Sequence, residues 1–318
     1  MRLGLMVEPQ LGGSYERLLA LARWAEDIGL DSFARSDHYL HFGTSSPATD
    51  ALTTFGGLAR ETERIQLVVL VTPITFRHPA VIAKTAATID EMSGGRLGLG
   101  IGTGWMEPEH EAFGMDLPDL TERFDRFAET LAYVRAATSG SGGFRGTHYE
   151  LRPIDVLPRP EALPIIVGGS GMRRTPTLAG RFADEYNMFT CERELFEQRV
   201  AVMRAAALEA GRDPDTITLS LATNTIVAST EAAFREMIAP RAARREATPD
   251  EYVELLRAQN VPHGTPEEAA AGIERMAAMG VSKVYLQEMS ALDDVDTAKL
   301  GSIVGAVRAR PNPDGDPV

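Results

Sequence analysis

Short apolar runs alternate with segments of helical periodicity from one end of the chain to the other. The runs with strand character lie near residues 2–7, 32–36, 65–71, 96–102, 164–168, 185–189, 217–228 and 282–288. A helical stretch follows each of them, which is the order of a parallel sheet with crossover helices. Eight such units in 318 residues match the size of a TIM barrel. A doubly wound sheet usually has fewer strands and a glycine fingerprint after the first. The pattern predicts an α/β fold, a TIM (β/α)8 barrel with insertions.

We expect one domain over residues 1–309, interrupted twice. Residues 139–163 are rich in Gly and Pro and too long for an ordinary connection, so they predict a hairpin or a lid. Residues 239–264 separate the seventh and eighth units and predict an extra helix and part of a substrate pocket. Directly after them, Thr265 and Glu268 have the spacing of a capping box. The Pro- and Asp-rich tail, 310–318, has little to bury and is expected to be disordered.

The fourth predicted strand has glycine at every second position. In "GRLGLGIGTGWMEPEHEAFG", residues 95–114, these are Gly98, Gly100, Gly102 and Gly104. The spacing does not fit the dinucleotide motif G-x-G-x-x-G. Glycine with a period of two is typical of a strand in which one face admits something close to the backbone, and a narrow barrel interior is the simplest such neighbour.

Composition and charge restrict the class of protein. The formal net charge is −13 without a basic block, which disfavours binding to nucleic acid or to an anionic membrane. The single Cys191 cannot form an intramolecular disulfide and suits a reducing compartment. The first ten residues have neither the charge nor the apolar length of a signal peptide or a membrane segment. We expect a cytoplasmic protein.

Candidate chemistry lies where the predicted strands end, because the active site of a TIM barrel is built there. Glu8 ends the first strand, and no His-x-His pair accompanies it, so we expect no metal site. The fifth strand ends in Gly168, Gly169 and Ser170, and Arg173 and Arg174 begin the next helix. This arrangement favours a phosphate at a helix N-terminus. Alternatively, the glycines only permit a tight turn and the arginines are solvated.

Several ordered segments together resemble a known family. They are "VEPQ", "ARSDHYL", "TPITFRHPAVIAKTAATIDEMSGGRLGLGIGTGW", "EHEAFG", "ERFDRFAETL" and "VGGSGMRRT" with "FADEYN". This set, which covers about residues 1–190, resembles the bacterial luciferase-like family of barrel oxidoreductases, and in particular the branch that uses the deazaflavin coenzyme F420. The resemblance continues more weakly through "GTPEEAAAGIERMAAMGVSKVYLQ".

The resemblance implies a role for each matching residue. Asp37 and His38 match the pair that binds the deazaflavin ring edge, where histidine takes part in proton or hydride chemistry. Thr72, with Val69 and Leu70, matches a third-strand bulge that carries a non-prolyl cis peptide, expected near Val69-Leu70. The remaining implied cofactor contacts are Gly102, Thr103 and Gly104 at the ring and ribityl chain, and Gly168, Gly169, Ser170, Arg173 and Arg174 at the phosphate. The resemblance thus implies that the glycine strand admits the planar ring.

The same resemblance implies an oxidoreductase that passes hydride between F420 and a small organic substrate. Two alternatives remain: an FMN-dependent monooxygenase of the same fold, served by a partner reductase, and a non-catalytic flavin-binding protein. Relatives that oxidise glucose 6-phosphate have Glu directly after Gly-Thr-Gly and Trp shortly after Asp-His. Trp105 and Phe42 occupy these places here, so sugar-phosphate oxidation is not expected. The family also implies a homodimer.

Imidazole exchanges a proton near neutral pH, so His38 is the expected acid or base, and Asp37 beside it is the second expected catalytic residue. In the alternative role, His38 only bonds a backbone carbonyl and Asp37 only caps the turn that follows.

Overall fold

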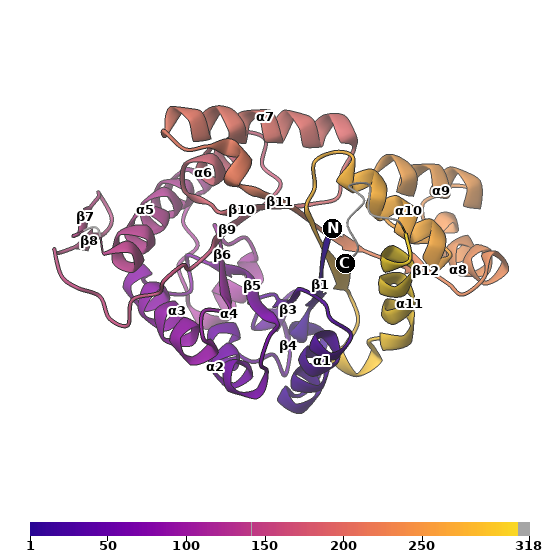
Figure 1. Cartoon of the computed structure of the whole chain (residues 1–318), viewed down its shortest axis with the longest axis horizontal. Helices are drawn as coiled ribbons and strands as arrows, with labels where there is room; N and C mark the ends of the chain where they lie inside the picture. Colours follow the sequence, from indigo (N-terminus) through magenta and orange to yellow (C-terminus); the bar gives the residue numbers. More distant parts are fainter. Residues whose placement is uncertain (141, 311–318) are drawn as a thin grey trace.

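Eight parallel strands close into a barrel in a computed structural model that describes residues 1–140 and 142–310 (Figure 1). Around the barrel they are β1 (Arg2–Val7), β2 (Ser32–Arg35), β5 (Gln66–Pro73), β6 (Leu97–Gly102), β9 (Ile165–Gly168), β10 (Glu185–Phe189), β11 (Thr218–Asn224) and β14 (Lys283–Glu288). Pairing of β14 with β1 completes the ring. The predicted TIM barrel is confirmed. The predicted disordered tail falls, from residue 311 on, outside the described residues.

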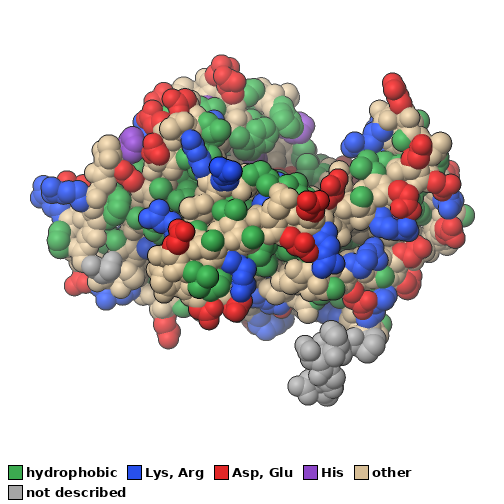
Figure 2. All heavy atoms as spheres, turned by 90° about the horizontal axis from the view of Figure 1, so that it is seen from above, with side chains coloured by type: hydrophobic (Ala, Val, Ile, Leu, Met, Phe, Trp, Pro, Cys, Tyr) green, Lys and Arg blue, Asp and Glu red, His purple; other side chains and the backbone are tan. Residues whose placement is uncertain are grey.

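Helices surround the barrel on the outside (Figure 1). They are α1 (Tyr15–Asp27), α2 (Ala51–Glu61), α3 (Pro79–Ser93), α5 (Leu120–Ser139), α6 (Arg174–Phe182), α7 (Arg193–Glu209), α8 (Glu231–Ala243), α9 (Pro249–Ala258), α10 (Pro266–Ala277) and α11 (Thr297–Arg308). The short helix α4 (Glu107–Phe113) instead lies inside this ring, at the end of the barrel where the strands end. Three short 3-10 turns, Pro9–Leu11, Pro214–Thr216 and Leu292–Asp294, complete the connections. In the described part of the chain, none of these helices combines the length and the apolar character needed to cross a membrane. Acidic and basic side chains are interspersed on the face shown in Figure 2.

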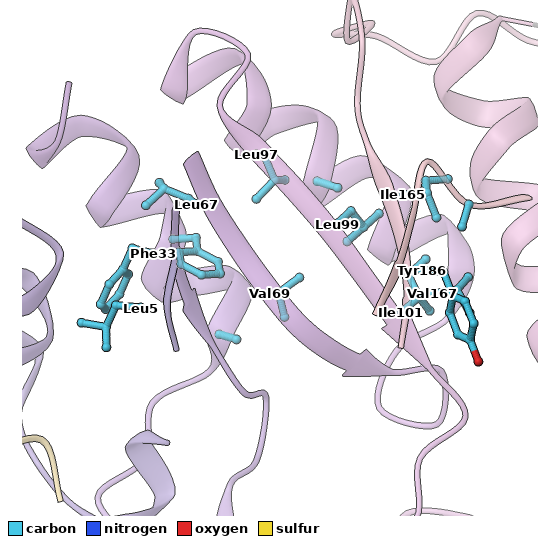
Figure 3. Packing of buried hydrophobic residues seen from close by; sticks show 14 of the residues in the cluster. Leu5, Phe33, Leu67, Val69, Leu97, Leu99, Ile101, Ile165, Val167 and Tyr186 are labelled. Atoms are coloured by element: carbon cyan, nitrogen blue, oxygen red, sulfur yellow. The ribbon is translucent and has the colours of Figure 1, made fainter. Parts of the chain in front are cut away.

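The alternation of residues along each strand produces two apolar layers. Leu97, Leu99 and Ile101 of β6 belong to the large cluster between barrel and helices, with matching residues of β1, β2, β5, β9 and β10 (Figure 3). The alternate positions face the barrel interior, where a smaller cluster contains Met6, Leu70 and Ile166. Because successive strand residues point to opposite faces, the glycines of β6 all lie on the interior side.

These glycines make room for a neighbouring strand. A Cβ at Gly100 would lie 2.1 Å from the Val69 carbonyl oxygen, and a Cβ at Gly102 or Gly168 would lie 2.6 or 2.8 Å from the Val71 side chain. The non-prolyl cis peptide expected near Val69-Leu70 is present one bond later, between Leu70 and Val71. The register of β5 against β6 shifts at the same place. Packing against β5 is thus one reason for these glycines, and the approach of a planar ring to their backbone stays a prediction.

Replacing Gly100 with Ala is expected to destabilise the fold by about 1–3 kcal/mol, because the added methyl overlaps backbone that cannot rotate away. Urea unfolding followed by far-UV circular dichroism measures the change. Gly305→Ala is the matched control, since a Cβ at this position of α11 meets nothing within 4 Å, and Ala there gains up to about 1 kcal/mol of helix propensity. Equal stability of the two variants would contradict the packing role of Gly100.

Both insertions contain the predicted secondary structure. Residues 139–163 form a hairpin of β7 (Phe144–Arg145) and β8 (Glu150–Leu151), whose turn amides donate to Glu129 of α5. Residues 239–264 include α9, the extra helix. Among the described residues, neither insertion lines the main pocket described below, so the expected lid and the expected contribution to that pocket are not found. The capping box of Thr265 and Glu268 is confirmed.

The seventh strand is shorter than predicted. It ends at Asn224 instead of continuing to 228, and β12 (Ile226–Val227) leaves the barrel to pair with β13 (His263–Gly264). The amides of Ile226 and Ala228 donate to Pro262 and Gly264, so this segment has backbone partners outside the barrel. A short third pair, β3 (Leu40–His41) and β4 (Thr44–Ser45), follows β2. This hairpin lies at the carboxyl ends of the barrel strands.

A polar network fills the opposite end of the barrel interior. Lys283 Nζ lies 3.3 Å from Glu185 Oε2 and 3.0 Å from Gln66 Oε1, and all three residues stand at strand starts. Tyr285 and Ser220 donate hydroxyl hydrogens to Glu185 Oε1 at 2.9 and 2.7 Å. Lys283 and Glu185 are both buried. The ion pair closes the barrel below the pocket.

Candidate active site

The main pocket lies at the carboxyl ends of the barrel strands and has a volume of about 360 Å³. Its lower part is lined by side chains of the interior cluster, among them Met6, Leu70, Val71 and Ala222. Polar side chains from β1, β10 and β14 (Glu8, Asn187 and Gln287) line the same pocket. An apolar surface with polar groups beside it is the usual character of a small-molecule site.

His38 is held by a carboxylate that the sequence analysis did not single out. His38 Nδ1 lies 3.0 Å from Oε2 of Glu109 in α4. Oε1 of Glu109 accepts the amide hydrogens of Tyr39 and Leu40. Burial raises the pKa of Glu109, but the hydrogen bonds from His38 and from the two amides outweigh it and lower that pKa below its usual range. Glu109 is thus an ionised carboxylate in the pocket lining.

An ionised carboxylate can only accept hydrogen bonds, so His38 Nδ1 carries a hydrogen. The tautomer follows from this contact: Nε2 is the ring atom left to accept a hydrogen or, in the imidazolium, to donate one. Among the described residues Nε2 has no hydrogen-bond partner. The His38 ring also meets Trp105 edge to face, with centroids 5.7 Å apart. The structure therefore presents one imidazole nitrogen for proton exchange.

Asp37 has a different position from its neighbour in the chain. Its Oδ1 accepts the amide hydrogen of Ala51 at the start of α2, and Oδ2 accepts from Thr72 at 2.7 Å and from Arg77 at 2.6 Å. The side chain is fully buried. Arg77 also pairs with Asp50. Both oxygens of Asp37 are engaged within the protein, so its geometry is that of a residue that fixes β2, β5 and α2 together at the pocket.

Glu8 and two glutamines form a second polar group in the pocket. Glu8 is buried, and it accepts hydrogen bonds from Gln10 at 2.6 Å and from Gln287 at 2.5 Å. Gln10 Oε1 in turn accepts from Ser36. Sequence reasoning weighed Glu8 only as a metal ligand. Its position at the end of β1 was the available signal, whereas the partners on β14 are distant in the sequence.

The structure brings most, but not all, of the predicted site residues to the pocket. Those that line it are Asp37, His38, Leu70, Gly102, Thr103, Gly104, Gly168 and Gly169. Val69 instead packs in the outer core, and Thr72 is buried against Asp37. Ser170, Arg173 and Arg174 lie outside the lining, where α6 begins. Gly168 and Gly169 connect the two places, so the predicted phosphate loop adjoins the pocket.

The arginines of that loop lie on the surface. Arg174 is exposed, with its guanidinium 5.3 Å from the centroid of Phe124, and Arg173 precedes it as the N-cap residue of α6. Ser170 accepts, through its carbonyl, a hydrogen bond from Arg199. As for metals, no group of three or more His, Cys, Asp or Glu side chains within residues 1–140 and 142–310 has the arrangement of a binding site.

A closed (β/α)8 barrel with a polar and apolar pocket at its strand ends defines the class of TIM-barrel proteins that bind small molecules at that face. The chain belongs to the luciferase-like monooxygenase family, which matches residues 1–283. It is 37% identical over 193 residues to an F420-dependent glucose-6-phosphate dehydrogenase of Microbacterium testaceum, covering 58% of this chain and 56% of that protein.

Two other similarities widen the range of activities among relatives. A pyrimidine monooxygenase, RutA, of Allorhizobium ampelinum is 32% identical over 214 residues, which are 63% of this chain and 57% of that protein. The crystal structure of the monooxygenase RslO1 from Streptomyces bottropensis superposes with a TM-score of 0.78 at 24% identity, over 96% of this chain and 97% of that one. The chain spans about half the length of the curated relatives it matches. These relatives are named as oxidoreductases and monooxygenases.

Proposed function

We propose that this protein is an F420-dependent oxidoreductase that transfers a hydride between the coenzyme and a small organic substrate. The observation that carries the proposal is the oriented imidazole of His38, with Nδ1 fixed by Glu109 and Nε2 free in a pocket at the strand ends. The similarity to F420-dependent dehydrogenases supports it. The similarity to a protein named as a pyrimidine monooxygenase keeps open the FMN-dependent alternative.

The donor set of the pocket suits a planar heterocycle. Leu70 and Val71 offer an apolar surface, and the carboxylate of Glu8 with the amides of Asn187 and Gln287 offers acceptors and donors for ring N–H and carbonyl groups. Bound F420 would supply or accept the hydride. The phosphate would lie by Gly168, Gly169 and Ser170 with Arg173 and Arg174, at the N-terminus of α6.

The protein's own residues then have separate tasks. His38 Nε2 gives a proton to a substrate oxygen, or removes one, as hydride moves to or from the adjacent carbon. Glu109 holds that imidazole in one tautomer. Asp37 ties the loop after β2 to Arg77 and Thr72, so the imidazole is presented from a fixed backbone.

Direct binding separates the FMN-dependent alternative from our proposal, whereas turnover separates the non-catalytic one. In the FMN-dependent alternative, a partner reductase supplies reduced flavin and oxygen is a substrate. In a non-catalytic flavin-binding protein, the cofactor binds without turnover. Titration of the purified protein with F420 and, separately, with FMN, followed by cofactor fluorescence, tests the choice. Tight binding of FMN with no response to F420 would refute our proposal. The homodimer stays a prediction, as does the expected cytoplasmic location.

The phosphate assignment predicts that Arg173→Glu with Arg174→Glu weakens binding of F420 and of FMN by about tenfold or more, since hydrogen bonds to charged groups contribute about 1.5–3 kcal/mol each. Fluorescence titration gives the dissociation constants. The matched control is Arg193→Glu with Arg204→Glu, which makes the same change of charge on α7. If the first variant is folded and binds both cofactors as tightly as the parent, the phosphate lies elsewhere.

A further inference from the structure

The pocket lining contains three carboxylates and, within the described residues, no Lys or Arg. The carboxylates are those of Glu8, Asp37 and Glu109. Their protein donors are already in place: glutamine amides for Glu8, Arg77 for Asp37, and His38 with two amides for Glu109. Proteins bind phosphate and carboxylate groups with Arg, Lys or free backbone amides. Arg77 balances the charge of Asp37, but Glu8 and Glu109 have only amide and imidazole donors, so an anionic substrate entering this pocket meets negative charge instead.

The mouth of the pocket is apolar. Large hydrophobic side chains that are more than half exposed line it from four strand ends: Phe42 at 64%, Trp105 at 58%, Phe189 at 55% and Met289 at 55%. Phe42 and Trp105 approach each other with centroids 5.9 Å apart. Exposed apolar groups gathered around one opening mark a binding surface. Each of these side chains can gain contacts from a ligand that it lacks in the free protein.

The turn between β3 and β4 holds Phe42 at this mouth. Phe42 has a φ of 48° and Gly43 a φ of 83°, both in the left-handed region. A bulky residue seldom adopts this conformation, which suits the two central positions of a tight hairpin. The backbone therefore displays an aromatic ring to solvent beside Trp105, which in turn contacts the His38 ring. A ring with no protein layer over it is available to stack on a planar ligand.

We infer that the site takes an uncharged substrate with a planar apolar part, and that it discriminates against phosphorylated substrates. The inference rests on the proposed function and names the substrate class of the same site. The planar part packs on Phe42 and Trp105 at the mouth, and its carbonyl or hydroxyl points to His38. Phosphorylated sugars are excluded by charge and by the apolar rim, although relatives of this chain are named for glucose 6-phosphate.

A matched pair of probes tests the charge selection. Equilibrium dialysis of the full chain with 2-naphthol and with 2-naphthyl phosphate gives a dissociation constant for each, first without cofactor and then with saturating F420. We expect the uncharged probe to bind at least about tenfold more tightly, a difference typical of one unfavourable charge contact. Equal affinity, or tighter binding of the phosphate ester, overturns the inference.

Variants locate the surface. Phe42→Ala and Trp105→Ala are each expected to weaken 2-naphthol binding by about fivefold or more, because each removes a stacking partner. Leu208→Ala, on α7 and 65% exposed, is the control for loss of an exposed apolar side chain away from the pocket. Unchanged affinity in both aromatic variants overturns the assignment to the rim.

Phe42→Arg separates charge from shape. It places a cation at the mouth, so the preference for the uncharged probe is expected to shrink, and an unchanged preference contradicts the charge argument. The dialysis without cofactor does not depend on coenzyme binding. If the protein binds neither F420 nor FMN but still selects 2-naphthol through Phe42 and Trp105, the proposed function fails while the pocket selectivity holds. If F420 binds and the two naphthyl probes bind equally well, the pocket selectivity fails while the proposed function holds.

Discussion

His38→Ala is expected to lower the single-turnover rate by about 10²–10⁴-fold, the usual contribution of general acid–base catalysis, while F420 affinity changes little. The reason is geometric. Glu109 fixes the Nδ1 hydrogen of His38, so Nε2 is the proton-exchanging atom at the pocket, and alanine removes it without touching Asp37. Of the two other histidines in the lining, His41 is exposed to solvent, and His110 is occupied on both nitrogens by Thr75 and the Met106 carbonyl.

The measurement is a rapid-mixing experiment with reduced F420 and a substrate found by screening uncharged enones, imines and ketones. Glu109→Gln is the informative companion. It keeps the size of the side chain, but the carboxylate that accepts three N–H hydrogens becomes an amide with only one oxygen to accept them. The tautomer of His38 is then no longer fixed. We expect its rate to fall less than that of His38→Ala. A ratio near one between parent and His38→Ala would assign the histidine to binding or to scaffolding.

The sequence alone predicted the barrel because its evidence is local. Alternating apolar positions such as Leu97, Leu99 and Ile101 identify a strand without reference to any other part of the chain. The seventh strand was too long in the prediction because Ile226 and Val227 have the same apolar character as β11 but pair with His263 and Gly264. Nothing in the residues themselves distinguishes the two partners.

The site was predictable where family motifs mark strand ends, as at Asp37, His38, Gly168 and Gly169. It was not predictable where a function depends on a distant contact. Glu109 lies 71 residues from His38, among other glutamates, and only the fold identifies it as the partner. Likewise, the sequence does not show that the space beside Gly102 is filled by the Val71 side chain of a neighbouring strand.

Lys283→Met is expected to destabilise the protein by about 3–5 kcal/mol, a large share of the 5–15 kcal/mol that holds an ordinary domain folded. Lys283 is 1% exposed, and its ammonium pairs with Glu185 inside the barrel. Burial lowers the pKa of Lys283, and the charge of Glu185 opposes this shift. Without the lysine, the carboxylate remains buried with only the neutral donors Tyr285 and Ser220.

The loss comes from the unpaired charge rather than from the missing side-chain volume, and a second substitution separates the two causes. Glu185→Gln in the Lys283→Met background removes the charge and retains an oxygen for Tyr285 and Ser220, so we expect it to restore most of the lost stability. Urea unfolding of the parent, of both single variants and of the double variant completes a double-mutant cycle. A Lys283→Met protein as stable as the parent would contradict the role of the ion pair.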